Sequence, residues 1–266
     1  MFCEDFIFNN EFLSDHGLML CSFDGAEGSV SGGDVTFITS KPPSTDRFSH
    51  YATQMETPIS MNFQICKMGC DLDEQSDYYF TQDEQSYIYR WLQRLDGYHW
   101  LAFEQDGWED VWFNAQFNLQ PIYLMGHVIG YDCTVLTDSP YGYSQEYSKQ
   151  FDLNSGQSFA FKNYSDIPGI IYPYTIITPK TSGTVKLESG CDGNAMVLTE
   201  ITNSLSPITL DGNNDYIDGI GSLDYFNFQF PVLVNTYDNT DTYFKNNGDI
   251  NLNIKIKYRY IRRVQV

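Results

Sequence analysis

Apolar and polar side chains alternate with a period of two along several stretches of this 266-residue chain. Successive side chains of a β-strand point to opposite faces, so the alternation predicts strands with one buried face and one polar face. The clearest stretches are residues 57–66, 111–119, 129–135 and 250–258. Their predicted buried side chains are Ile59, Met61, Phe63 and Ile65; Val111, Phe113, Ala115, Phe117 and Leu119; Ile129, Tyr131, Cys133 and Val135; and Ile250, Leu252, Ile254, Ile256 and Tyr258.

One segment has a helical pattern instead. Thr81 followed three residues later by Glu84 predicts a capping box, and Gly97 is expected to end the helix. Between them, apolar side chains recur at helical spacing: Tyr87, Ile88, Trp91, Leu92 and Leu95. A single apolar stripe on a short helix predicts that it lies across a sheet or a barrel mouth and closes the core there.

Residues 137–144 mix proline and glycine with small polar side chains after a predicted strand, which indicates a domain boundary. Beyond it, short apolar runs alternate with turn residues at the spacing of a β-sandwich. These runs are residues 159–161, 170–177, 185–187, 196–201 and 225–230. The chain has no fixed-period repeat, which excludes solenoids and propellers. We predict a mostly β protein with one helix and two domains, residues 1–144 and 145–266.

Acidic residues outnumber basic ones by 35 to 15, and the predicted pI is 4.3. This excess argues against a nucleic-acid binder, which needs clustered Lys and Arg. Residues 1–147 hold 5 basic and 23 acidic side chains (5 − 23 = −18), and residues 148–266 hold 10 and 12 (10 − 12 = −2). The basic residues near the C-terminus form either a solvated face or a contact surface for a partner. They are Lys255, Lys257, Arg259, Arg262 and Arg263.

The first residues carry Glu4 and Asp5 where a signal peptide has Lys or Arg, and no apolar stretch is long enough to span a membrane. We therefore expect a soluble chain that is not secreted by that route and has no membrane partner. Six cysteines are too sparse for a disulfide scaffold, which predicts reduced and mostly buried thiols. They are Cys3, Cys21, Cys66, Cys70, Cys133 and Cys191.

Candidate chemistry is weak throughout. The four histidines His16, His50, His99 and His127 stand near no nucleophile motif. The most enzyme-like cluster places carboxylates beside tryptophans, as glycoside hydrolases do, although an acidic chain brings such neighbours together by chance. It comprises Glu104, Asp106, Glu109 and Asp110 with Trp100, Trp108 and Trp112, and we interpret residues 108–110 as a turn. No catalytic residue and no cofactor is predicted.

Metal and phosphate motifs are incomplete. Cys66 and Cys70 lack the second ligand pair of a zinc site. Calcium could use Asp211, Asn213 and Asp215, or Asp71, Asp73 and Glu74, but neither set has the complete EF-hand pattern. The segment Gly28-Ser-Val-Ser-Gly-Gly33 lacks the lysine of a phosphate-binding loop, so we interpret it as a flexible loop. No metal site is predicted.

The order of features along nearly the whole chain resembles the distal tail protein family of siphophages and related prophages. The similarity lies in order and spacing and involves no catalytic signature. The segments that carry it are Asp15–Gly25; the helix Tyr87–Leu95 with the following Asp96–Phe103; Gly130–Tyr143; Asn163–Pro168 with Tyr172–Ile176; Ile208–Gly212; and Lys257–Val264.

The resemblance implies an N-terminal split β-barrel with one helix that assembles head to tail into a hexameric ring, and a C-terminal galectin-like β-sandwich. It implies a structural, non-enzymatic hub of the virion tail tip, made in the bacterial cytoplasm. The hub would join the tail tube to the tail-tip or lysin protein, with receptor-binding proteins as further partners, while DNA passes through its channel unbound. An exposed strand face with Trp112, Asn114 and Gln116 is our candidate ring interface.

Two rival functions remain open. Twenty tyrosines and nineteen phenylalanines would also suit a carbohydrate-binding β-sandwich, because sugar faces stack on aromatic rings. The same residues are ordinary strand formers and interface residues, and residues 145–266 are too short to hold the inserted carbohydrate-binding module of longer relatives. An acidic glycoside hydrolase is the third alternative.

Overall fold

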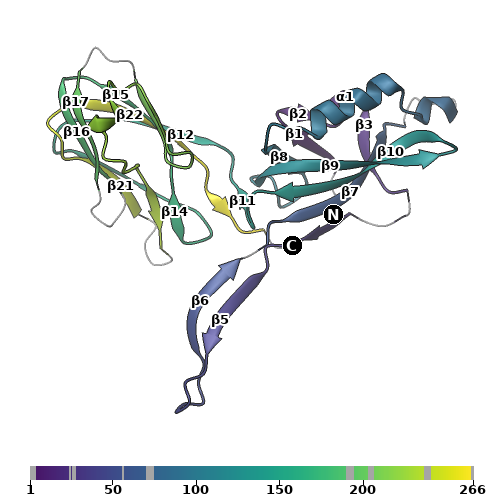
Figure 1. Cartoon of the computed structure of the whole chain (residues 1–266), viewed down its shortest axis with the longest axis horizontal. Coiled ribbons are helices and arrows are strands. Elements are labelled where there is room, and N and C mark those ends of the chain that lie inside the picture. The colour runs from purple at the N-terminus through teal and green to yellow at the C-terminus, as the bar shows by residue number, and fades with distance from the viewer. Residues whose placement is uncertain are drawn as a thin grey trace. The chain divides into compact units, whose positions relative to one another are not determined.

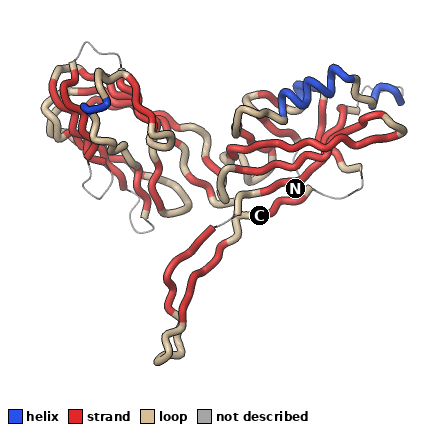
Figure 2. Tube along the Cα trace, viewed as in Figure 1, coloured by secondary structure: helices blue, strands red, loops and turns tan. Residues whose placement is uncertain are grey.

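The computed structural model describes residues 4–23, 25, 28–55, 57–69, 75–189, 195–202, 207–236 and 241–264. The chain divides into two compact units. The N-terminal unit comprises Met1–Tyr143 with Arg263–Val266, and the C-terminal unit comprises Ser144–Arg262. Strands dominate both units (Figure 2), which confirms the prediction of a mostly β chain. Among the described residues, no helix is both long and apolar enough to cross a membrane.

A large antiparallel sheet organises the N-terminal unit (Figure 1). Its main strand order is β2-β1-β8-β9-β10-β7-β3, with β4 added beside β7 and β11 beside β9. The strand path is open between β2 and β3 within the described part of the chain. The strands are β1 (Asp5–Phe8), β2 (Glu11–Phe12), β3 (Leu18–Cys21), β4 (Ser29–Ser31), β7 (Ser60–Lys67), β8 (His99–Glu104), β9 (Trp112–Leu124), β10 (His127–Thr137) and β11 (Gly142–Tyr143).

The predicted alternation identifies most of the strand residues that are buried in the core of this unit. On β7 and β9 the expected apolar faces are buried, apart from the half-buried Val111 just before β9. The prediction fails at the start of β10, where Val128 is buried and Ile129 is only half-buried. A register irregularity between Val128 and Gly130 explains this. An extra residue in one strand reverses which side chains are buried before the irregularity relative to those after it.

Helix α1 (Gln82–Leu92) begins as predicted and ends earlier than predicted. The Thr81 hydroxyl accepts the Glu84 backbone N–H, and the Glu84 carboxylate accepts the Thr81 N–H at 2.7 Å, which completes the capping box. Ile88, Trp91 and Leu92 pack into the core. The predicted stripe is wrong at both ends, because Tyr87 is 39% exposed and Leu95 is 98% exposed. Leu95 lies beyond the helix, in the segment that leads into β8.

The Glu84 carboxylate links the helix start to β7, since it also pairs with the Lys67 ammonium at 2.8 Å. Partial burial raises the pKa of Glu84, but hydrogen bonds from Lys67 and Thr81 outweigh it and lower that pKa overall. We expect Glu84→Gln to lower the free energy of unfolding by about 0.5 kcal/mol at neutral pH, because the amide keeps the cap and loses the ion pair.

A lowered folded-state pKa stabilises the fold above the unfolded pKa and loses that effect as pH falls through the folded value. The difference between wild type and Glu84→Gln should therefore shrink in acid, measured by urea unfolding across pH. Asp83→Asn, on the same helical turn, is the control. A difference that grows in acid would contradict this account of Glu84.

A separate hairpin lies between β4 and β7 and was not among the predicted strands. Its strands β5 (Val35–Ser40) and β6 (Ser49–Met55) pair with each other and with no other described strand. Before it, Ser29–Ser31 forms β4 against β7, so the expected flexible loop is wrong there. Strand β4 forms because Val30 lies opposite Met61 and packs on the core.

The C-terminal unit is a β-sandwich, as the turn spacing predicted. One sheet has the order β12-β22-β15-β18-β19 and the other β13-β21-β16-β17, and side chains from both form one core. A small pair of strands, β14 with β20, accompanies the two sheets. The strands are β12 (Tyr147–Leu153), β13 (Ser158–Lys162), β14 (Gly169–Ile171), β15 (Tyr174–Pro179), β16 (Gly183–Ser189), β17 (Ala195–Ile201), β18 (Ile208–Asp211), β19 (Tyr216–Asp218), β20 (Leu233–Asn235), β21 (Asp241–Asn246), β22 (Leu252–Tyr258) and β23 (Ile261–Arg262).

Within this unit the alternation of residues 250–258 is confirmed by β22, whose apolar face is buried. The apolar run 225–230 does not form a strand. A short 3-10 helix (Leu223–Tyr225) ends there, Phe226 makes a single bridge to Leu198, and Phe228 has a φ of +55°. That left-handed backbone breaks the extended conformation that the apolar run suggested.

Candidate functional site

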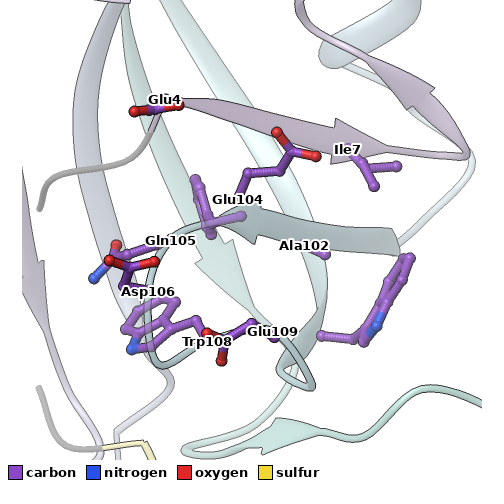
Figure 3. Close-up of a pocket in the computed structure, with 10 residues that line it drawn as sticks. Glu4, Ile7, Ala102, Glu104, Gln105, Asp106, Trp108 and Glu109 are labelled. Carbon is purple, nitrogen blue, oxygen red and sulfur yellow. The ribbon is translucent and has the colours of Figure 1, made fainter.

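A hollow of about 1020 Å³ on the N-terminal unit is lined by carboxylates and tryptophans. We call it the acidic groove, and define it by Glu4, Glu104, Asp106, Trp108, Glu109 and Trp112. Figure 3 shows the labelled carboxylates and the Trp108 indole arranged around this hollow. The groove therefore combines negative charge with large apolar rings.

Strand register brings the groove together from three segments. Strand β1 pairs with β8 so that Ile7 lies opposite Ala102, and β8 pairs with β9 so that Ala102 lies opposite Trp112. Phe6 and Phe103, one residue along, are opposite each other and buried in the core. Because neighbouring strand residues point to opposite faces, Ile7, Ala102 and Trp112 form an apolar floor on the outer face of the sheet.

The turn between β8 and β9 supplies the other wall of the groove. The Trp108 ring packs against Phe113 with ring centroids 5.5 Å apart, which fixes its position. The Glu109 carboxylate accepts the Gly107 backbone N–H at 3.0 Å, and backbone hydrogen bonds from Gly107 and Glu109 lower its pKa. Glu109 is thus held as a carboxylate at neutral pH. Such a surface is suited to bind a segment that presents cations beside apolar side chains.

The sequence cluster considered for sugar hydrolysis is partly brought together here. Glu104, Asp106, Glu109, Trp108 and Trp112 line the groove, whereas Asp110 and Trp100 do not. Residues 108–110 lie in the turn between β8 and β9, as predicted. A glycosidase general acid needs a raised pKa, and the pKa of Glu109 is shifted in the opposite direction.

The remaining metal and thiol candidates fall into ordinary structural surroundings. Asp211 accepts hydrogen bonds from the Asn213 backbone and the Asn214 amide, which closes the β18–β19 turn. Within the described ranges, no three His, Cys, Asp or Glu side chains are grouped to hold a metal. Cys133 is buried as predicted, but Cys21 and Cys66 are only half-buried. The candidates that lie outside the described residues are Cys3, Cys70, Asp71, Asp73, Glu74 and Cys191.

Two family models match nearly the whole chain. Residues 1–139 match the phage tail protein N-terminal domain, and residues 141–258 match the phage tail C-terminal domain. The chain belongs to the phage tail proteins. This places it in the tail of a virion, as the sequence resemblance implied. No curated protein matches the sequence.

The fold of this phage tail protein is similar to a solved structure, the crystal structure of the SPP1 Dit (gp 19.1) protein. That protein is described as a paradigm of the hub adsorption apparatus in phages that infect Gram-positive bacteria. The TM-score is 0.62, the sequence identity is 11%, and the match covers 96% of this chain and 98% of the other. The similarity therefore concerns the fold of both units, and it agrees with the predicted mostly β architecture.

The predicted ring-interface residues of the tail protein follow the outer face of β9. Trp112 lies in the acidic groove, and Gln116 is exposed. The Asn114 amide donates to the Asp138 carboxylate at 2.9 Å, so part of its hydrogen-bonding capacity is used within the unit. Their contact with another subunit stays a prediction.

The basic residues near the C-terminus of the tail protein largely have partners within their own unit. The Lys257 ammonium lies 3.3 Å from the Glu146 carboxylate, and the Arg259 guanidinium donates to the Ser144 carbonyl at 2.8 Å. Arg262 donates to the Tyr164 carbonyl at 2.9 Å. Contact with a partner by Lys255, Lys257, Arg259, Arg262 and Arg263 also stays a prediction.

Proposed function

We propose that this phage tail protein is a hub of the tail tip, in which six copies form a ring with a central channel. The observation that carries the proposal most directly is the similarity of fold to a tail hub protein over 96% of this chain. The family match to phage tail domains supports it independently. In this role the N-terminal units form the ring, and the C-terminal galectin-like units project outward.

The charge of the N-terminal half suits a conduit for DNA. Residues 1–147 carry a net charge of −18, so six copies would carry 6 × (−18) = −108. Where part of that charge lines the channel, it repels the phosphate backbone and lets DNA pass without binding. Acidic surfaces also improve solubility, so this charge supports the proposal without being specific to it.

The proposed partners follow from the position of a hub. The ring would contact the tail tube protein on one side and the tail-tip or lysin protein on the other. The C-terminal unit would dock receptor-binding proteins, with the basic end from Lys255 to Arg263 as the candidate surface. A head-to-tail ring needs two different complementary patches on each subunit, and the acidic groove beside Trp112 supplies one of them.

A second candidate function is sugar binding by the C-terminal unit. A hollow of about 330 Å³ in that unit is lined by Tyr172, Phe228, Asp215 and Gln229, among others. Exposed rings beside a carboxylate and an amide are the groups that sugar sites use. A glycan array on the full chain, with binding lost in Phe228→Ser, would favour this function over the hub.

The mass of the purified chain in solution tests the ring. One chain has a mass of 30.6 kDa, so a hexamer should give 6 × 30.6, or about 184 kDa, by light scattering. We expect this mass to persist across salt concentrations, because a specific interface is only partly electrostatic. A mass of one chain under all conditions would contradict a ring that forms without other tail proteins.

A further inference from the structure

The β5–β6 hairpin exposes large apolar side chains on both of its faces. Phe37, Phe48 and Tyr51 are 65%, 70% and 67% exposed, and Ile38 is also exposed on the face opposite Phe37. An isolated two-stranded hairpin is marginally stable in water, and clustered exposed apolar side chains mark interaction surfaces. This hairpin therefore has the features of a segment that another surface covers.

The hairpin is also the exception to the negative charge of the N-terminal half. Residues 35–55 hold Lys41, Arg47 and one carboxylate, Asp46, which lies 3.3 Å from Lys41 (2 − 1 = +1). The rest of residues 1–147 holds 3 basic and 22 acidic side chains (3 − 22 = −19). A net cationic, apolar hairpin thus belongs to an otherwise strongly acidic half.

The three other cations of this half are engaged within the N-terminal unit. Lys67 pairs with Glu84, and Arg94 pairs with Asp96. The Arg90 guanidinium lies over the Tyr87 ring, 5.7 Å from its centroid. Lys41 also has a partner, Asp46, but both side chains lie on the hairpin and are exposed, so the hairpin as a whole presents a net positive charge to another molecule.

We propose that the hairpin of one copy of this chain docks into the acidic groove of a second copy. Lys41 and Arg47 face the carboxylates of the groove, and Phe37 and Phe48 cover its apolar floor at Ile7 and Trp112. This inference rests on the proposed ring and names the contact that builds it. Charge complementarity selects the occupant, because the cationic apolar hairpin matches a groove lined by four carboxylates and two tryptophans.

The arrangement also fits ring closure. The hairpin and the groove are different surfaces of the same unit, so their contact is heterologous, and a heterologous contact can generate a closed ring. The hairpin's side chains are exposed in the single chain, so it does not fill a groove of its own. Each copy then offers one hairpin and one groove, and no copy in a closed ring is left with either surface uncovered.

Charge reversal on both sides tests the pairing in the full chain. Lys41→Glu with Arg47→Glu, and separately Glu104→Lys with Glu109→Lys, should each lower the ring's association constant at least about tenfold, measured by light scattering against concentration. The combination of all four substitutions should restore assembly to near the wild-type value. Tryptophan fluorescence checks that each variant is folded. Asp15→Lys with Asp83→Lys makes the same charge change as the groove pair, at exposed sites outside the groove, and should leave the ring intact.

A zero-length amine-to-carboxyl crosslinker gives a second readout. In rings mixed from nitrogen-14 and nitrogen-15 chains, we expect mixed-label peptides that join Lys41 to Glu104, Asp106 or Glu109. A ring that tolerates both reversals and gives no such crosslink overturns the hairpin contact and leaves the hub proposal standing. If each double variant loses the ring and the variant with all four substitutions does not regain it, the hairpin and the groove do not pair with each other. A wild-type chain that stays monomeric overturns a ring that forms from this chain alone, and this contact with it.

Discussion

Replacing Phe6 with alanine is expected to lower the free energy of unfolding of the N-terminal unit by about 4 kcal/mol, the usual cost of truncating a buried phenylalanine. Phe6 is fully buried, and its ring lies near four others, one from helix α1 and three from strands β7, β8 and β9. The centroid distances are 5.7 Å to Phe63, 6.3 Å to Trp91, 6.0 Å to Phe103 and 5.7 Å to Phe117. The cavity would therefore open where the helix meets the sheet.

Tryptophan fluorescence measures this effect for the N-terminal unit alone, because all four tryptophans lie between residues 91 and 112. With a urea slope of about 2 kcal/mol per molar, the fluorescence transition should move down by about 2 M. Phe244→Ala is the matched control, since Phe244 is fully buried in the C-terminal unit. It should shift the circular-dichroism transition and leave the fluorescence transition in place. A fluorescence transition that moves equally in both variants would contradict two separately folding units.

Gly32→Ala is expected to destabilise the N-terminal unit by about 3 kcal/mol and to weaken ring assembly. Gly32 has a φ of +107°, a conformation that side chains other than glycine rarely adopt. A Cβ atom there would also clash with the Pro58 carbonyl oxygen. The chain passes this point on its way from β4 to the hairpin, so any shift displaces the root of the hairpin that we propose to dock.

Gly126→Ala separates backbone strain from the clash. Gly126 also has a positive φ, +85°, but a Cβ atom there would meet nothing within 4 Å. We expect this control to cost about 1 kcal/mol and to leave assembly unchanged. Equal urea-unfolding losses in the two variants would show that contact with Pro58 plays no part.

Sequence patterns predict the elements that are set by residues close together in the chain. The period-two alternation identified the buried faces of β7, β9 and β22, because each strand has a single core face along most of its length. The pair Thr81 and Glu84 identified the start of α1, because both capping hydrogen bonds form within three residues. The end of the helix was predicted less well, because Leu95 continued the apolar spacing after the helix had turned into the segment leading to β8.

Other features depend on contacts that one sequence does not reveal. Ile129 follows the alternation of its strand, and only the register irregularity against β9 takes it off the buried face. The β5–β6 hairpin has no core face, so its exposed aromatics on both sides give no clean alternation. Gly32 and Gly33 are typical of a flexible loop by sequence, whereas in the structure the close approach of the backbone to Pro58 requires a glycine at position 32.

The sequence predicts only part of the acidic groove. The carboxylates and tryptophans between residues 104 and 112 are close together in the chain and were recognised as a cluster. Glu4 and Ile7 join them only through the pairing of β1 with β8, a contact about 100 residues apart that no short motif records. Charge complementarity with the hairpin became visible only once these three segments formed one surface.

We expect this phage tail protein to form a six-membered ring by itself, and the rotational symmetry of its particles decides whether it does. Full-length chain should be purified without other tail proteins and imaged by negative-stain electron microscopy with class averaging. We predict closed rings with sixfold symmetry and an open centre. Particles without a central opening, or open filaments built from the same head-to-tail contact, would contradict the hub.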